Sequence, residues 1–183
     1  MNLSKSIKEA FYRPTKWTIQ SVGTASASVK FAAGAVGHLD LKWGSEEKIY
    51  SYTYEAVGVS IGTSLGIGGS VGYSPEEAPG TGTALYFLPA TLNKYLFEAE
   101  LPGPVALVAG DAFIRGAVAV FVGSSRTLQW LIPTIGTGLS ALGPPGIATM
   151  LLGFKAVGFY QGPEGVGGAG VSVLLGDMRR RWA

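Results

Sequence analysis

The chain of 183 residues has no cysteine, one histidine and few charged residues. Without cysteine, disulfide scaffolds, thiol catalysis and cysteine-ligated metal sites are excluded. His38 alone cannot make a two-histidine metal site, and nothing around it in the sequence forms a recognisable catalytic triad. We therefore expect no enzyme, no cofactor and no metal site.

Charge is scarce, which limits the classes of partner. Charged residues make up 14 % of the chain, against roughly 25 % in an average globular protein. The net charge of +2 is too small to argue for a nucleic-acid partner. Hydrophobic residues make up 47 %, which excludes a disordered chain. Glycine is abundant, at 28 residues, and this combination suits a tight β-fold or a protein that uses a membrane.

Residues Trp17 to Trp43 alternate in polarity, with apolar or small side chains at the odd positions and mostly polar ones at the even positions. A period of two predicts β-structure, because successive side chains leave opposite faces of a strand. The segment is too long for one ordinary strand, so we expect a hairpin that turns near Ala33–Gly37. Lys42–Lys48 then forms the next turn.

A second β-segment is expected from Ile49 to Tyr73. Its first half has Tyr50, Tyr52 and Tyr54 on one face. In its second half one face carries only glycine and serine, which indicates close approach of another backbone. Two interpretations stay open: a tightly packed sheet face, or a glycine zipper within a membrane. The candidate zipper positions are Gly58, Gly62, Gly66, Gly68 and Gly72.

No charged residue lies between Arg126 and Lys155. Two apolar arms surround a turn there, which predicts a hydrophobic hairpin over 128–159. Each arm is long enough to cross a bilayer as a tilted strand of about 9–11 residues. A buried hairpin in a soluble core is the alternative. The candidate membrane positions are Leu139, Gly143, Pro144, Pro145, Gly146 and Leu151.

The expected architecture is mainly β: a Gly-rich antiparallel sandwich or barrel-like single domain over residues 1–183. Residues 1–14 form a short amphipathic N-terminal helix, 15–75 a β-rich half, 76–104 a linker-like region and 105–183 an apolar half. Val105–Gly123 is predicted as either a helix or two strands. Val166–Leu175 is another Gly-rich strand, and the basic tail Arg179–Trp182 suits an interfacial anchor for anionic lipid or a solvated terminus.

The Gly/Ser register of Gly58–Gly72, the arms around Gly143–Gly146 and the segment Val166–Val173 resemble small pore-forming antibacterial effectors delivered by type VI secretion. This compositional resemblance covers about half of the chain. It implies a soluble or chaperone-held form, a secretion-tube partner, and a membrane-bound immunity protein in protected cells. It also implies ion leakage across a target membrane, with the lipid bilayer as partner and a homo-oligomer as a candidate assembly.

Met1–Arg13 has no apolar stretch typical of a cleaved export signal, so we expect synthesis in the cytoplasm and a leaderless route of secretion. With few charges to line a wide channel, a pore would be narrow and lined by backbone and hydroxyl groups. The alternative function is a soluble structural or ligand-binding β-module, and a third is an integral membrane component without toxicity. The candidate pore-lining residues are Ser60, Ser64, Ser70, Thr134 and Thr137.

Overall fold

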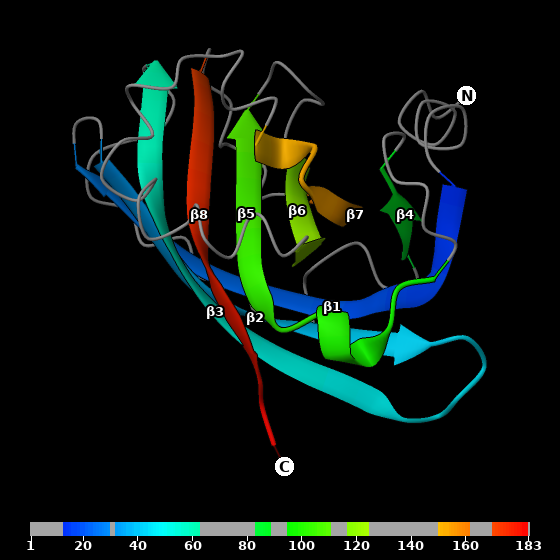
Figure 1. The fold of residues 1–183 in the computed structure, drawn as a ribbon. Helices are drawn as coiled ribbons and strands as arrows, with labels where there is room; N and C mark the ends of the chain where they lie inside the picture. The colour runs from blue at the N-terminus through cyan, green and yellow to red at the C-terminus, as the bar shows by residue number, and fades with distance from the viewer. Residues whose placement is uncertain are drawn as a thin grey trace.

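The described residues form a closed antiparallel β-barrel (Figure 1). The computed structural model describes residues 13–29, 32–62, 83–88, 95–110, 117–124, 150–161 and 170–182. The strands are β1 (Arg13–Val29), β2 (Ala32–Trp43), β3 (Ile49–Gly62), β4 (Thr83–Phe87), β5 (Gly103–Gly110), β6 (Ala117–Ser124), β7 (Phe154–Gln161) and β8 (Gly170–Arg180), and a short 3-10 helix, η1, covers Glu98–Glu100. The predicted mainly β architecture is confirmed, and of the two predicted alternatives the structure is a barrel rather than a sandwich.

The barrel consists of two Greek keys. Around the barrel the order is β1-β2-β3-β8-β5-β6-β7-β4, so β4 returns beside β1 and β8 returns beside β5. Three consecutive strands with the fourth beside the first define a Greek key. Each half of the chain therefore folds into one key, and the fourth strand of each key closes the barrel against the third strand of the other.

The two seams between the keys are unequal. At one seam, β3 and β8 stay in register from Tyr52–Arg180 to Gly62–Gly170. At the other, in the part of the chain that the structure describes, only Tyr86 and Phe87 of β4 align with β7. The keys are thus joined by one long ladder and one short one.

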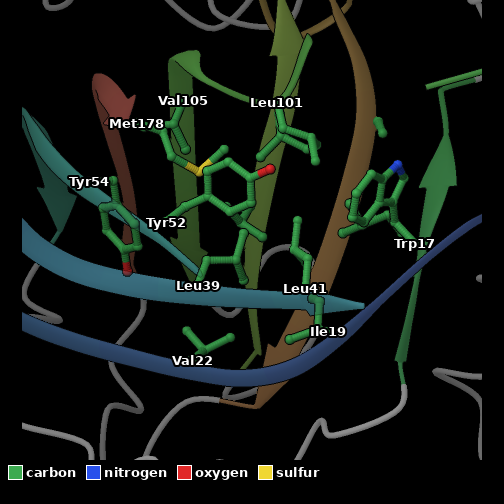
Figure 2. Packing of buried hydrophobic residues seen from close by; sticks show 14 of the residues in the cluster. Trp17, Ile19, Val22, Leu39, Leu41, Tyr52, Tyr54, Leu101, Val105 and Met178 are labelled. Carbon is green, nitrogen blue, oxygen red and sulfur yellow. The ribbon is translucent and has the colours of Figure 1, made fainter. Parts of the chain in front are cut away.

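The barrel interior is filled with side chains. An eight-stranded barrel is just wide enough for its inward side chains to fill it, and the inward positions here are large and apolar. Figure 2 shows the Tyr52 ring in the interior, beside Leu39, Leu101 and Met178. The largest fully buried residues include Trp17, Ile19, Leu39, Leu41, Tyr52, Leu85, Leu96, Leu101, Val105, Val120 and Met178.

The outside of the barrel has two different walls. On β1–β3 the outward residues are largely polar, among them Thr18, His38, Asp40, Thr53 and Glu55, and none of these is buried. On β5–β8 many outward residues are apolar and buried, and they form a second hydrophobic cluster with Met150 and Leu151, whereas Asp177 and Arg179 near the end of β8 are charged and exposed. We call this set the outer apolar wall: Ala106, Val108, Ala119, Phe121, Val157, Phe159, Val173 and Leu175.

Two glycines stand where β3 and β8 approach most closely. A Cβ built on Gly58 would lie 1.9 Å from the carbonyl oxygen of Val173, and one built on Gly176 would lie 1.7 Å from that of Glu55. Neither position has room for a side chain. Glycine in a strand often marks such close backbone approach, so these two residues permit the tight bend of the long seam.

The first hairpin differs from its prediction in two ways. Val29 at the end of β1 pairs with Ala32 at the start of β2, so Ala33–Gly37 lies in a strand rather than in the turn. In addition, the register of β1 against β2 shifts between Ile19 and Ser21, which is typical of a β-bulge. The bulge changes which positions face inward, so Val22 is buried although it falls on the even-numbered face.

Other elements follow the sequence more closely. Val105–Gly123 forms two strands, β5 and β6, which confirms the two-strand alternative. The region predicted as linker-like, 76–104, contributes β4 to the barrel. β8 extends through Arg180, so part of the basic tail belongs to a strand. The predicted helix over 1–14 lies outside the described residues except for Arg13 and Pro14, which belong to β1. Among the described residues, no helix is long and apolar enough to cross a membrane.

Candidate functional site

Aromatic rings gather at the end of the barrel where β1 enters, β2 ends and β3 begins. Trp17 and Trp43 are paired across β1 and β2, with ring centroids 4.9 Å apart in an edge-to-face arrangement. Tyr50 of β3 packs edge-on against Trp17 at 5.1 Å. Such geometry is favourable for aromatic pairs, so these three rings form a continuous row.

Cations extend this row on both sides. The Lys16 ammonium lies 5.7 Å from the centre of the Trp43 ring, and the Lys48 ammonium lies 4.7 Å from that of Tyr50. The Arg180 guanidinium lies 5.3 Å from the Tyr50 ring and 4.4 Å from the Trp182 ring. All four distances are within the range of cation–π attraction. We call this set the aromatic–cationic end: Lys16, Trp17, Trp43, Lys48, Tyr50, Arg180 and Trp182.

Residues 95–101 close the same end of the barrel, and we call them the closing segment. Leu96 and Leu101 are buried in the core. The Trp17 indole Nε1–H donates a buried hydrogen bond of 2.8 Å to the Leu96 carbonyl oxygen. Gly123 has a φ of +74°, and a Cβ there would lie 2.9 Å from Leu96 Cδ1, so glycine is required beside the inserted leucine.

Two ion pairs hold the closing segment to the barrel. The Glu98 carboxylate pairs with Arg180 of β8, and the Glu100 carboxylate pairs with Lys155 of β7. These four side chains are partly buried. Both carboxylates of the segment are therefore neutralised by the barrel that they cover.

The outer surface of the closing segment is aromatic. Tyr95 and Phe97 are 62 % and 61 % exposed, and their rings stack with centroids 6.0 Å apart. Trp182, on the adjoining C-terminal residues, is 76 % exposed. Large exposed aromatic side chains on one surface are typical of binding surfaces.

Two tyrosines at this end have perturbed acidity. Burial, followed by the charge and hydrogen bond of Glu46, raises the pKa of Tyr50, while Arg180 opposes the shift. Burial raises the pKa of Tyr52 to about 12. The Tyr52 hydroxyl is buried without a hydrogen-bond partner, and Figure 2 shows it directed into the barrel beside Leu101. Both tyrosines are thus neutral at physiological pH.

The polar outer wall carries the histidine of the chain and an aspartate on neighbouring positions of one face. His38 is half-buried on β2, opposite Thr53 of β3. Asp40 accepts a hydrogen bond of 2.6 Å from the Ser21 hydroxyl. Within the described ranges, no group of three His, Asp or Glu side chains could hold a metal ion.

The sequence-predicted membrane and pore residues divide into two groups. Gly58, Ser60 and Gly62 lie along β3 in the long seam with β8, and Leu151 is buried against the outer apolar wall. The others fall outside the described residues: Gly66, Gly68, Gly72, Leu139, Gly143, Pro144, Pro145, Gly146, Ser64, Ser70, Thr134 and Thr137.

Sequence reasoning missed the closing segment. Its signal was present in the alternation of exposed Tyr95 and Phe97 with buried Leu96, but the segment is short and lies in a region read as linker-like. The sequence predicted the basic tail as a candidate membrane anchor. It could not predict that Arg180 of this tail lies over the Tyr50 ring, because that contact depends on the pairing of β3 with β8. Comparison with known proteins gave no match: no family model, no curated protein and no solved structure matches this chain.

Proposed function

We propose that this protein is membrane-active and dissipates ion gradients across a lipid bilayer. The observation that carries the proposal is the outer apolar wall: the described parts of β5 and β6, and the middle of β7 and β8, are apolar on both faces. In a barrel exposed to water on its outside, outward positions are ordinarily polar, as they are here on β1–β3. An outward band of apolar residues is instead what faces lipid in a membrane β-barrel.

The strands are close to the length that a bilayer requires. A tilted strand that crosses the hydrocarbon has about 9–11 residues, whereas β5, β6 and β7 have 8 each. β8 has 11 residues, of which the last four include Asp177, Arg179 and Arg180. In the closed barrel the apolar wall is buried, with Met150 and Leu151 packed against it. The closed barrel therefore represents a water-compatible form, and membrane action requires that the wall be uncovered.

The filled interior bears on the mechanism. Large side chains such as Trp17 and Tyr52 occupy the barrel, so the closed form is not itself a channel. On this proposal ions pass only after rearrangement in the bilayer, along a narrow path of backbone carbonyls and hydroxyls such as Ser60. The proposal extends to a biological role: the protein is an antibacterial effector that is delivered into a neighbouring bacterium. Protected cells would then contain an immunity partner.

The experiment uses the purified protein and vesicles that hold both a potassium gradient and a trapped large dye. The proposed function predicts loss of potassium before loss of dye, because a narrow path excludes large solutes. Simultaneous release of dye and potassium would indicate a wide pore or bilayer disruption. Intact gradients at protein levels that bind the vesicles would favour a soluble structural or ligand-binding module instead.

A further inference from the structure

We propose that the aromatic–cationic end, together with the exposed rings of the closing segment, is the surface that docks on anionic lipid headgroups. This inference rests on the proposed membrane activity and names the part of the molecule that meets the bilayer first. Figure 1 shows that the C-terminus and η1 lie at the same end of the barrel. The partner is a bilayer whose surface carries phosphate groups.

The first argument is the chemistry of the exposed rings. Tyr95, Phe97 and Trp182 are each more than 60 % exposed. The Arg180 guanidinium connects them, since it pairs with Glu98 of the closing segment and lies 4.4 Å from the Trp182 ring. Tyrosine and tryptophan are enriched at the membrane–water interface, where an apolar ring with a polar edge is favoured. The three rings are therefore placed to enter the headgroup region together.

The second argument is charge. Lys16, Lys48 and Arg181 are exposed, and the Arg181 backbone N–H donates to the Ser51 carbonyl oxygen at 2.8 Å, which holds that residue at this end. Each basic residue near an anionic leaflet strengthens binding by about fivefold. The exposed cations are thus complementary to phosphate.

The acidic groups at this end nearly balance the basic ones. Glu98 and Glu100 are neutralised by Arg180 and Lys155. Glu46, which accepts a hydrogen bond of 3.3 Å from the neutral Tyr50 hydroxyl, and Glu47 are exposed on one turn. Against these two carboxylates stand the three exposed cations, so the surface that remains for a partner is aromatic with an excess of one positive charge.

Exposed apolar residues elsewhere have a different setting. Val36 and Val57 are 53 % and 59 % exposed, but they lie on the polar outer wall of β2 and β3, beside Glu55. They are aliphatic, and none of the ring contacts described above involves them. They serve as matched controls of equal exposure.

The test is cosedimentation of the full chain with vesicles of phosphatidylcholine alone or mixed with phosphatidylglycerol. The wild type is expected to bind the mixed vesicles more tightly, and Phe97→Ala combined with Trp182→Ala to weaken this binding by about tenfold or more. Lys48→Gln is expected to weaken binding to the mixed vesicles by about fivefold and to leave binding to phosphatidylcholine unchanged. Val57→Ala should change neither, and unaltered thermal unfolding verifies that each variant is folded.

The outcomes separate this inference from the function on which it rests. Binding that depends on Phe97 and Trp182 without potassium release would retain the docking surface and overturn the proposed function. Potassium release with binding unaffected by these substitutions, or weakened equally by Val57→Ala, would overturn the docking surface alone. Absence of binding to either vesicle by the wild type would overturn both.

Discussion

Among the buried polar side chains that the structure describes, the Tyr52 hydroxyl is an exception, because it lies in the barrel core without a hydrogen-bond partner. An unsatisfied buried polar group costs about 1–3 kcal/mol. The aromatic ring offsets this cost by filling the space between Leu39, Leu101 and Met178 (Figure 2). The aromatic ring of Tyr52 therefore stabilises the core, whereas its hydroxyl does not.

Tyr52→Phe is expected to leave the free energy of unfolding unchanged at neutral pH or to raise it by about 1 kcal/mol. The hydroxyl should matter at alkaline pH, because the pKa of Tyr52 rises from 10.0 to about 12 on folding. The folded protein then keeps a proton that the unfolded chain loses, so stability is fully present below pH 10 and is lost as pH rises toward 12. Denaturant unfolding across this range measures it. A steeper alkaline loss in Tyr52→Phe than in the wild type would contradict the account.

The glycines of the long seam give a second test at the scale of single residues. Gly176→Ala should lower the free energy of unfolding by roughly 3 kcal/mol or more, because its Cβ would lie 1.7 Å from the Glu55 carbonyl oxygen. Gly34→Ala is the matched control, since its Cβ would meet the Ala56 carbonyl oxygen at an ordinary 3.7 Å. We expect this control to change stability by less than about 1 kcal/mol. Equal effects of the two substitutions would exclude close approach at Gly176.

At the scale of elements, polarity patterns predicted the strands well where one face is polar. The alternation of Tyr50, Tyr52 and Tyr54 with polar residues predicted a strand with the three tyrosines on one face, and in β3 all three are buried. Strict alternation does not hold at Val22, which is buried, because the register shift between Ile19 and Ser21 exchanges the inward and outward positions. The sequence did not distinguish β5 and β6 from a helix. Strands that are apolar on both faces show no alternation of polar and apolar residues, which is the pattern that identifies a strand.

The short seam between β4 and β7 is expected to open first. In the described residues it aligns two positions of β4, whereas the β3–β8 seam runs the length of Tyr52–Gly62. Amides of β4 should therefore exchange with solvent about 100-fold faster than the paired amides of β3, because local opening needs less free energy. Hydrogen exchange resolved by peptide measures the difference. Equal protection of the two strands would contradict an unequal closure of the barrel.

At the scale of the whole molecule, the sequence could not predict the order of strands or the candidate site. The two Greek keys depend on pairings such as β3 with β8, which join residues more than a hundred positions apart. The aromatic–cationic end combines Trp17, Trp43, Tyr50 and Arg180 from four strands. Each residue is unremarkable in its own segment, and only the closed barrel brings their side chains together.

If the protein opens a path for ions across a bacterial inner membrane, the electrical potential across that membrane must fall. The most direct measurement is this potential, followed with a voltage-sensitive dye in cells that receive the protein on the periplasmic side. The account predicts depolarisation while the membrane still excludes large dyes, and retention of the potential when Phe97→Ala and Trp182→Ala are combined. An unchanged potential in cells that contain folded wild-type protein in the periplasm would contradict it.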